Sequence, residues 1–391
     1  MYSEPHQFEP LLPTLPQPEL EALAEDLCRR AFELKRLVHP LTEVRIARLL
    51  RSVNSYYSNR IEGQQTHPTD IERALRKSFS KEPGKMRLQH LALAHIGAQQ
   101  DMEAWLVERP DSAVYGAAFL QQLHAAFYGR LSDAERVTAD RKFVTPGALR
   151  TADVTVGRHV APDWHALPEF LGRAEQVYAA ARGLSGKLIA IACAHQRIAW
   201  IHPFLDGNGR VVRLQSQAAL LQHGAGSALW SISRGLARDV QAYYLRLAEA
   251  DMERRGDLDG RGNLSEAGLV AFAKYFLETC LDQVAFMQQM LDLATLRNRV
   301  QGYLLYLSPA DKDVRPEVTP SLHYAFLAGS VSRGEFKQMT GLASRSADRA
   351  IAALLRRGLL ESDSAKGPVR FGLPLEALAY YFPQLYPEAA A

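Results

Sequence analysis

Apolar residues recur every three or four positions along most of this chain, which is the period of an amphipathic helix. The first such run covers residues 19–38, where the apolar positions that share one face are Leu20, Leu23, Leu27, Ala31 and Leu34. The same period predicts helices at 41–58, 68–76, 88–106, 117–131, 167–183, 187–200, 211–222, 237–252 and 264–296. Runs of β-branched residues are few, so we expect a mainly helical fold.

Two segments interrupt the helical pattern. Residues 142–162 contain a Pro-Gly turn and then the alternating stretch Val154, Thr155, Val156, closed by Gly157, an order that predicts a β-hairpin. Near the C-terminus, helices are expected at 326–341 and 343–357, followed by short strands at 359–361 and 369–371. Helix, turn, helix and hairpin in this order are typical of a winged helix-turn-helix.

Length and composition set broad limits on the protein. With 391 residues, 47% hydrophobic and 23% charged, the chain has the composition of a globular protein with two or three compact units. Its net charge of +3 is too small to indicate nucleic acid or membrane binding by itself. No window approaches the ~20 apolar residues that span a bilayer, and the first residues lack a signal-peptide core. The three cysteines are widely separated, which suits a reducing compartment, so we expect a cytoplasmic protein.

These patterns divide the chain into four predicted parts. We expect an N-terminal helical region at 1–105, a catalytic core at 106–260, a helical connector at 261–318 and a winged-helix domain at 319–391. In the last part, the second helix begins with Ser344, Arg345 and Ser346, as in helices that read DNA. The charge of that part is modest, so the winged helix could equally bind a protein or form a homodimer.

Residues 202–213 contain the strongest chemical signal, and they read HPFLDGNGRVVR. Two glycines before a predicted helix start let the backbone bind an anion closely. Arg210 and Arg213 lie three positions apart on one helical face and could bind a polyphosphate. Asp206 is a candidate Mg²⁺ ligand, and His202 is a candidate general base.

This segment resembles the signature of the Fic family, HPFx(D/E)GNGRxxR, at every specified position. The resemblance implies a helical Fic-domain fold that transfers AMP from ATP–Mg²⁺ to a Ser, Thr or Tyr hydroxyl of a target protein. It implies that His202 deprotonates the acceptor, that Asp206 holds Mg²⁺, and that Arg210 and Arg213 bind the β- and γ-phosphates. By the same resemblance, the phosphates rest on three loop residues, Gly207, Asn208 and Gly209. Phe204 is expected to be a packing anchor.

Two upstream motifs extend the resemblance. The predicted hairpin, with Val154, Thr155, Val156 and Gly157, is similar to the family's flap, whose strand edge docks an extended target segment. The segment 58–63, which we call the inhibitory segment, resembles the motif (S/T)xxxE(G/N) through Ser58, Glu62 and Gly63. That resemblance implies that Glu62 pairs with Arg213 and blocks productive binding of ATP.

Further candidates and alternatives remain open. Tyr243 and Tyr244 resemble a tyrosine pair near the family's adenine pocket, while Tyr56 and Tyr57 are candidate acceptors for self-modification. His195 is expected to have a structural role in the core. The alternatives to AMP transfer are a different nucleotide donor, removal of AMP, or a nucleotide-sensing transcription regulator that uses the winged helix on DNA. The intact His202 argues against pure sensing, since sensing needs no base.

Overall fold

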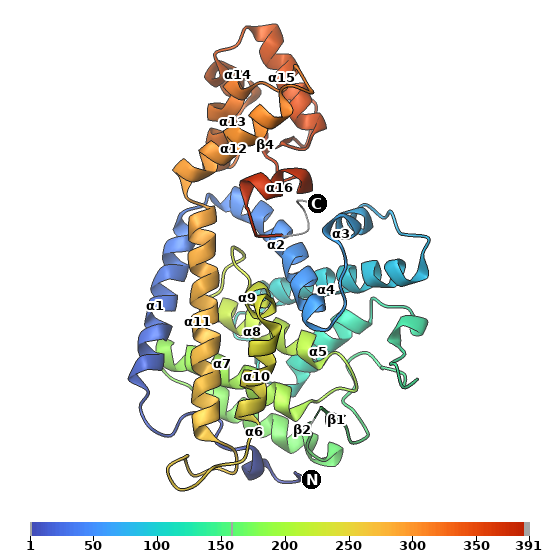
Figure 1. Cartoon of the computed structure of the whole chain (residues 1–391), viewed down its shortest axis with the longest axis vertical. Helices are drawn as coiled ribbons and strands as arrows, with labels where there is room; N and C mark the ends of the chain where they lie inside the picture. The colour runs from blue at the N-terminus through green and yellow to red at the C-terminus, as the bar shows by residue number, and fades with distance from the viewer. Residues whose placement is uncertain (1, 158, 387–391) are drawn as a thin grey trace.

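The computed structural model describes residues 2–157 and 159–386, and nearly all of its regular elements are helices (Figure 1). The helices before the signature loop are α1 (Pro18–Arg36), α2 (Pro40–Ile61), α3 (Pro68–Leu75), α4 (Pro83–Glu108), α5 (Ala117–Tyr128), α6 (Leu167–Ala179) and α7 (Leu184–Ile201). Those after it are α8 (Asn208–Gln222), α9 (Ile232–Arg238), α10 (Val240–Ala250), α11 (Glu266–Met290), α12 (Leu293–Leu307), α13 (Thr319–Ala328), α14 (Arg333–Thr340), α15 (Ser344–Arg356) and α16 (Leu375–Tyr381). The mainly helical prediction is therefore confirmed.

Three helices expected to be continuous are divided. The run at 237–252 splits into α9 and α10 at Asp239, whose carboxylate accepts a hydrogen bond from the Ala242 amide. Asp292 starts α12 in the same way, inside the run expected at 264–296, and α12 continues to residue 307. Ser332 starts α14 inside the run expected at 326–341. In each case a short polar side chain satisfies the free amides of a new helix start, which the apolar period does not reveal.

The centre of the molecule is built around α7. This helix is buried on nearly all sides, with 13 of its residues in the interior, and it packs among α1, α6, α8 and α11. The long helix α11 lies beside α1 along one side of the molecule (Figure 1). Because α7 is fixed by packing from four neighbours, the loop that follows it has a rigid base.

The hairpin predicted within 142–162 is present but short. Strand β1 (Thr155–Val156) pairs antiparallel with β2 (His159–Val160), in the register Thr155 to Val160. Val154 lies just outside the strand, and its carbonyl accepts a hydrogen bond from the Ala161 amide. Among the described residues neither strand pairs with a third strand, and the Val156 and Val160 side chains are exposed.

The C-terminal elements form one end of the molecule and then return to α2 (Figure 1). Helices α13 to α15 are followed by an antiparallel pair, β3 (Leu360–Glu361) and β4 (Arg370–Phe371), in the order predicted from the sequence. After α16, the Leu385 carbonyl accepts a hydrogen bond from the Tyr57 hydroxyl at 3.2 Å. The identification as a winged helix and the four domain boundaries stay predictions. No helix in the described ranges is long and apolar enough to cross a membrane.

Candidate active site

The loop at 202–207 joins α7 to α8 through two residues in the left-handed region. His202 follows α7 with φ 51° and ψ 59°, and its amide donates to the Ile198 carbonyl. Gly207 precedes α8 with φ 83°, and a Cβ atom there would lie 2.6 Å from a ring carbon of Tyr128. Glycine is therefore required at 207 for both conformation and space.

Side chains close this loop from inside. The Asn208 amide group donates to the Phe204 carbonyl at 2.8 Å and accepts from the Phe204 amide at 2.9 Å. The buried Phe204 ring stacks on His124 at 4.1 Å between centroids, which fits its expected role as a packing anchor. In this structure Asn208 therefore shapes the loop, and its contact with a phosphate stays a prediction.

His202 is held in place through its backbone. The buried Arg150 guanidinium donates to the His202 carbonyl at 2.9 Å, and the Arg150 amide donates to the Pro203 carbonyl. Burial, followed by the nearby His159 and Arg150, lowers the pKa of the His202 imidazole to about 4. The imidazole is therefore neutral at neutral pH, which is the form that a general base requires.

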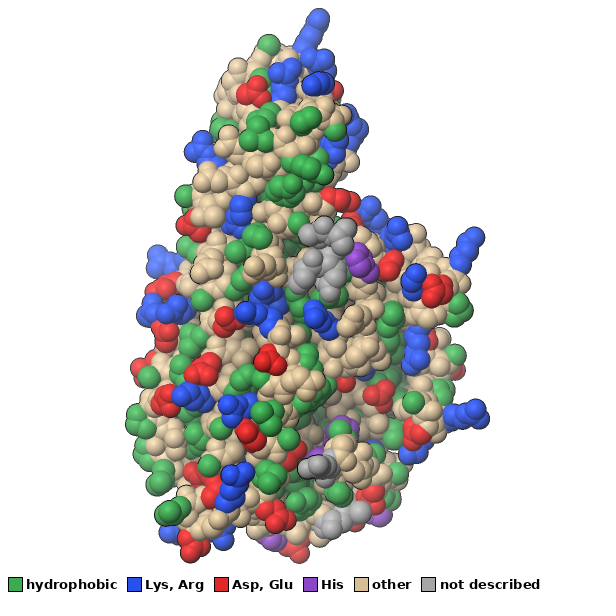
Figure 2. Space-filling model, in the orientation of Figure 1, with side chains coloured by type: hydrophobic (Ala, Val, Ile, Leu, Met, Phe, Trp, Pro, Cys, Tyr) green, Lys and Arg blue, Asp and Glu red, His purple; other side chains and the backbone are tan. Residues whose placement is uncertain are grey.

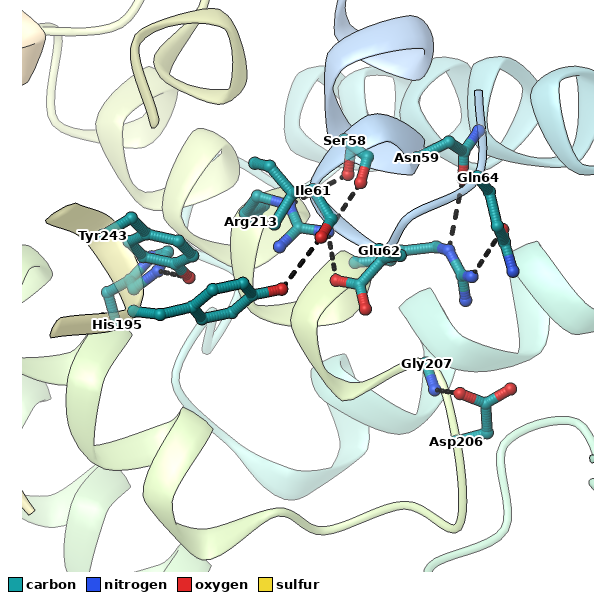
Figure 3. Close-up of polar contacts among 12 residues, drawn as sticks. Ser58, Asn59, Ile61, Glu62, Gln64, His195, Asp206, Gly207, Arg213 and Tyr243 are labelled. Atoms are coloured by element: carbon teal, nitrogen blue, oxygen red, sulfur yellow. Dashed lines mark hydrogen bonds and ion pairs between the residues drawn. The ribbon is translucent and has the colours of Figure 1, made fainter. Parts of the chain in front are cut away.

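Both arginines of the signature are buried. Figure 3 shows Arg213 directed toward Ser58 and Glu62 at the end of α2. The Nε atom of Arg213 donates to the Ser58 hydroxyl at 2.9 Å, and its Nη2 atom donates to the Ser58 carbonyl at 3.0 Å. The same Nη2 atom lies 2.7 Å from a carboxylate oxygen of Glu62. Arg210 donates instead to the side chains of Asn59 and Gln64.

Glu62 lies directly over the glycine turn. Its Oε1 atom would be 2.3 Å from a Cβ atom at Gly209. Burial raises the pKa of the Glu62 carboxyl, but Arg213 and then Arg210 outweigh this effect and lower the pKa below its ordinary value. The carboxylate is therefore ionised at neutral pH and lies between the loop and the Arg213 guanidinium.

A cavity of about 270 Å³ opens beside the loop and brings several predicted residues together. It is lined by His202, Asn208, Gly209, Arg213 and Glu62, by Tyr243 and Tyr244 from α10, and by Val156 and His159 from the hairpin. A cavity of similar size lies between α2, α3 and α16 and contains none of the signature residues. The predicted catalytic, inhibitory and flap residues thus meet at one place.

The two tyrosines of α10 have different surroundings. The buried Tyr243 hydroxyl lies 2.8 Å from Nε2 of His195, whose Nδ1 is 2.8 Å from the Ser216 hydroxyl. Those contacts agree with the structural role expected for His195. The Tyr244 side chain is half-exposed, and its hydroxyl donates to the Ile61 carbonyl at the end of α2. Nucleotide binding by either tyrosine stays a prediction.

Asp206 is exposed beside the glycine turn, and one of its oxygens accepts from the Gly207 amide at 2.7 Å. Within the described ranges, no group of three or more His, Cys, Asp or Glu side chains could hold a metal ion. A single carboxylate nevertheless fits Mg²⁺ that takes its remaining ligands from phosphates and water.

One expectation is corrected. Tyr56 and Tyr57, proposed as acceptors for self-modification, are each only 2% exposed. Tyr56 packs edge-on against Tyr386, and the Tyr57 hydroxyl bonds to the Leu385 carbonyl. Their position on α2 turns them toward the C-terminal residues, away from the cavity beside the signature loop, so they are not available acceptors in this structure.

Sequence reasoning predicted no contact for four residues that build the site, although Arg150 ends a stretch, Pro146 to Arg150, that resembles the PGxxR pattern of the family's flap. His124 accepts from the Gly147 amide and donates to the Asp206 carbonyl, so it connects the base of the hairpin to the signature loop. Arg150 makes a second such connection. Asn59 and Gln64 contact Arg210. Asn59 lies within the inhibitory segment and Gln64 directly follows it, so their proximity to that segment was the available signal.

Comparisons with known proteins agree with this geometry. Residues 115–220 match the family model described as Fic/DOC family. Protein adenylyltransferase Fic of Nematostella vectensis is 29% identical over 177 residues, which is 43% of this chain and 37% of that protein. The chain therefore spans little more than a third of the length of that relative.

Solved structures show the same fold. A Fic family protein from Desulfovibrio desulfuricans G20 covers 92% of this chain and 98% of its own, with a TM-score of 0.52 and 18% identity. A Fic domain containing signaling protein from Bacteroides thetaiotaomicron VPI-5482 covers 68% of this chain and 95% of its own, with a TM-score of 0.50 and 17% identity. They confirm the helical fold predicted from the signature.

Proposed function

Because this chain carries a Fic/DOC family domain, we propose that it is a protein nucleotidyltransferase that moves AMP from ATP to a hydroxyl group of a target protein. The observation that supports this most directly is the meeting of a neutral His202, the glycine turn and the buried Arg213 at one cavity. ATP as the donor is supported by the similarity to the adenylyltransferase of Nematostella vectensis.

In the proposed reaction, the oxygen of the acceptor hydroxyl forms a bond to the α-phosphorus while His202 accepts the proton of that hydroxyl. The bond between the α-phosphorus and the oxygen that bridges the α- and β-phosphates breaks, and pyrophosphate leaves. A pKa of about 4 makes His202 a weak base in the empty site, but a bound triphosphate brings negative charge that raises this pKa. Arg210 and Arg213 stabilise the phosphate charge, which is the main requirement of such transfers.

Asp206 is the residue that would hold Mg²⁺. Its exposed carboxylate next to the glycine turn fits an ion that is otherwise bound by phosphate oxygens and water. The ion would supply positive charge that neutralises the phosphates. The backbone at Gly207 and Gly209, at the start of α8, would bind the phosphates from the opposite side.

We further propose that Glu62 inhibits this reaction from within the chain. Its carboxylate lies 2.7 Å from Arg213, so a γ-phosphate and Glu62 would compete for the same guanidinium. A displaced γ-phosphate would shift the α-phosphate away from His202, and a misplacement of about 1 Å can cost ~10²-fold in rate. Inhibition by Glu62 would therefore change the position of the bound α-phosphate as well as the affinity for ATP.

The target would dock along the hairpin. Val156 is exposed on its strand and also lines the cavity. An extended target segment that pairs with this strand edge would place a hydroxyl near His202 through main-chain hydrogen bonds, whatever its side chains. Val154, Thr155 and Gly157 would contribute the backbone groups of this contact.

The test compares wild type, Glu62→Gly and Glu62→Gly/His202→Ala in cell lysate with ATP–Mg²⁺, with AMP incorporation measured by mass spectrometry. Glu62→Gly is expected to exceed wild type by at least ~10²-fold, and the added His202→Ala to abolish the signal. Equal labelling by wild type and Glu62→Gly would refute the inhibition. Absence of adenylyl transfer by Glu62→Gly would refute the activity.

A second candidate function is transcription regulation in response to nucleotide. It is favoured by the helix–turn–helix and hairpin of α13 to β4, and Figure 2 shows Lys and Arg side chains gathered at that end of the molecule. The Thr42 hydroxyl donates to the Phe326 carbonyl, which connects this part to α2. Duplex DNA binding measured with and without ATP distinguishes the two functions.

A further inference from the structure

Arg210 is held by two neutral side chains at the end of α2, those of Asn59 and Gln64, which are labelled in Figure 3. Its Nε atom donates to the Asn59 amide oxygen at 3.2 Å, and its Nη2 atom donates to the Gln64 amide oxygen at 2.9 Å. The guanidinium also lies over the Phe127 ring, 5.0 Å from the centroid, and next to the Tyr128 hydroxyl. Its face and one edge are therefore fixed by uncharged groups.

The geometry of a guanidinium gives these contacts a direction. The N–H of Nε and one N–H of Nη2 point along the same edge, and this is the edge that Asn59 and Gln64 take. The edge formed by Nη1 and Nη2 lies outside those two contacts, and it can bind two oxygens of one phosphate. The two amides thus orient Arg210 without using that second edge.

Arg213 shows the same arrangement with one addition. The Ser58 hydroxyl and carbonyl accept hydrogen bonds along the edge of Arg213 formed by Nε and Nη2, as the Asn59 and Gln64 side chains do for Arg210. Only Arg213 has a carboxylate, Glu62, bonded to Nη2. A carboxylate competes with phosphate for charge, whereas an amide or hydroxyl oxygen leaves the charge of the guanidinium available.

Gly63 explains how Gln64 reaches Arg210. It has φ 73°, its amide donates to the Arg60 carbonyl, and the Gln64 amide donates to the Asn59 carbonyl at 2.9 Å. These two bonds form a Schellman motif, which folds the chain back over the last turn of the helix. The Gln64 and Asn59 side chains are thereby brought to the same guanidinium.

We propose that Asn59 and Gln64 are positioning residues that present Arg210 to the nucleotide phosphates, so that the end of α2 supports the reaction that Glu62 restrains. This inference rests on the proposed function for its kinetic readout. Activation then requires displacement of the Glu62 side chain alone, because loss of the whole helix end would also release Arg210.

The test uses the full chain with Glu62→Ala, which removes the carboxylate without placing a second glycine beside Gly63. In this background Gln64→Ala is compared with Gln65→Ala, a neighbouring exposed glutamine that serves as the matched control. We expect Gln64→Ala to lower kcat/KM for ATP about tenfold, as for one lost hydrogen bond to a charged group. Adding Asn59→Ala should bring the loss to about 10²-fold, while Gln65→Ala leaves it unchanged.

Charge and binding measurements separate positioning from a merely structural role. Gln64→Glu keeps an acceptor oxygen but adds a carboxylate beside Arg210, so it should inhibit the Glu62→Ala protein, as Glu62 inhibits the wild type. Calorimetric Kd values for ATP should rise about tenfold in Gln64→Ala at an unchanged melting temperature.

The two readouts also separate this inference from the proposed function. If Glu62→Ala transfers no AMP, the proposed function fails, and the ATP Kd of Gln64→Ala against Gln65→Ala still decides the role of Gln64. Equal Kd values, or higher activity in Gln64→Ala than in Gln65→Ala, would overturn the positioning role.

Discussion

The ion pair between Glu62 and Arg213 makes a prediction that needs no target protein. Glu62→Gln removes the charge of the side chain and keeps its size. The Arg213 side chain is 1% exposed and the Glu62 side chain 30% exposed, so the substitution leaves a buried cation without its anion. ATP can supply a new anion to that cation. The variant should therefore be less stable than wild type without ATP and gain more stability when ATP is added.

The magnitude follows from the burial of each partner. Removing one member of a fully buried pair costs ~3–5 kcal/mol. Glu62 is partly exposed and Ser58 keeps two hydrogen bonds to Arg213, so we expect a loss of about 1–2 kcal/mol. For a chain of 391 residues, that loss corresponds to a fall in Tm of roughly 1–2.5 °C. Freed from competition, ATP should bind at least about tenfold more tightly, which is about 1.4 kcal/mol.

Scanning calorimetry with and without a fixed concentration of ATP measures both effects. Glu103→Gln is the matched control, because Glu103 pairs with Arg51 at 2.7 Å, with 19% and 22% of the two side chains exposed, and neither residue lines the nucleotide cavity. The control should lose stability without gaining an extra response to ATP. An ATP-dependent rise in Tm that is equal in wild type, Glu62→Gln and Glu103→Gln would refute the competition between Glu62 and phosphate.

Two further predictions concern the signature loop. Because burial, then His159 and Arg150, lower the pKa of His202 to about 4, the unfolded chain takes up this proton before the folded chain as pH falls. The contribution of the neutral His202 side chain to stability is therefore lost as the pH falls from about 6.5 to 4. The kcat/KM of Glu62→Ala should be constant from pH 8 to 6. A fall in kcat/KM centred near pH 6.5 would contradict the lowered pKa. Gly207→Ala should abolish ATP binding in calorimetry and cost ~1–3 kcal/mol in urea unfolding, because its Cβ would meet Tyr128 at 2.6 Å. Gly224→Ala is the control for backbone strain, because Gly224 has a similar φ of 76° and a Cβ atom there would have no atom within 4 Å. Equal ATP binding by the two variants would contradict the steric argument.

What the sequence predicted well is local. The last residue of α8 and the position of the glycine turn follow from consecutive residues, because helix ends and left-handed turns depend on neighbours in the chain, although α8 begins at Asn208 and not at the expected residue 211. The pairing of Glu62 with Arg213 crosses 151 residues, and only the resemblance to a known motif suggested it. Periodicity gives no information about which arginine a distant carboxylate will meet.

The contacts that were missed have a common physical reason. Arg150 holds the His202 carbonyl across 52 residues, and Gln64 holds Arg210 across 146 residues. The residues that make such contacts are ordinary polar side chains at a turn or a helix end, where a solvent-exposed position is the default expectation. Their burial is decided by how α5, α7 and the end of α2 pack, which depends on the whole core.

The direction of the side chains on α2 shows the same limit most clearly. Tyr56 and Tyr57 precede Ser58 in the sequence, yet they face residues 385–386 while Ser58 and Glu62 face Arg213. Successive residues of a helix point about 100° apart, so proximity along the chain does not place side chains on one surface. An amphipathic helix would have revealed its inner face, but the last turns of α2 are buried almost all round. The inhibitory segment therefore lies at the end of a core helix that C-terminal residues also contact, and Tyr56 and Tyr57 are held in place by their contacts with Tyr386 and Leu385.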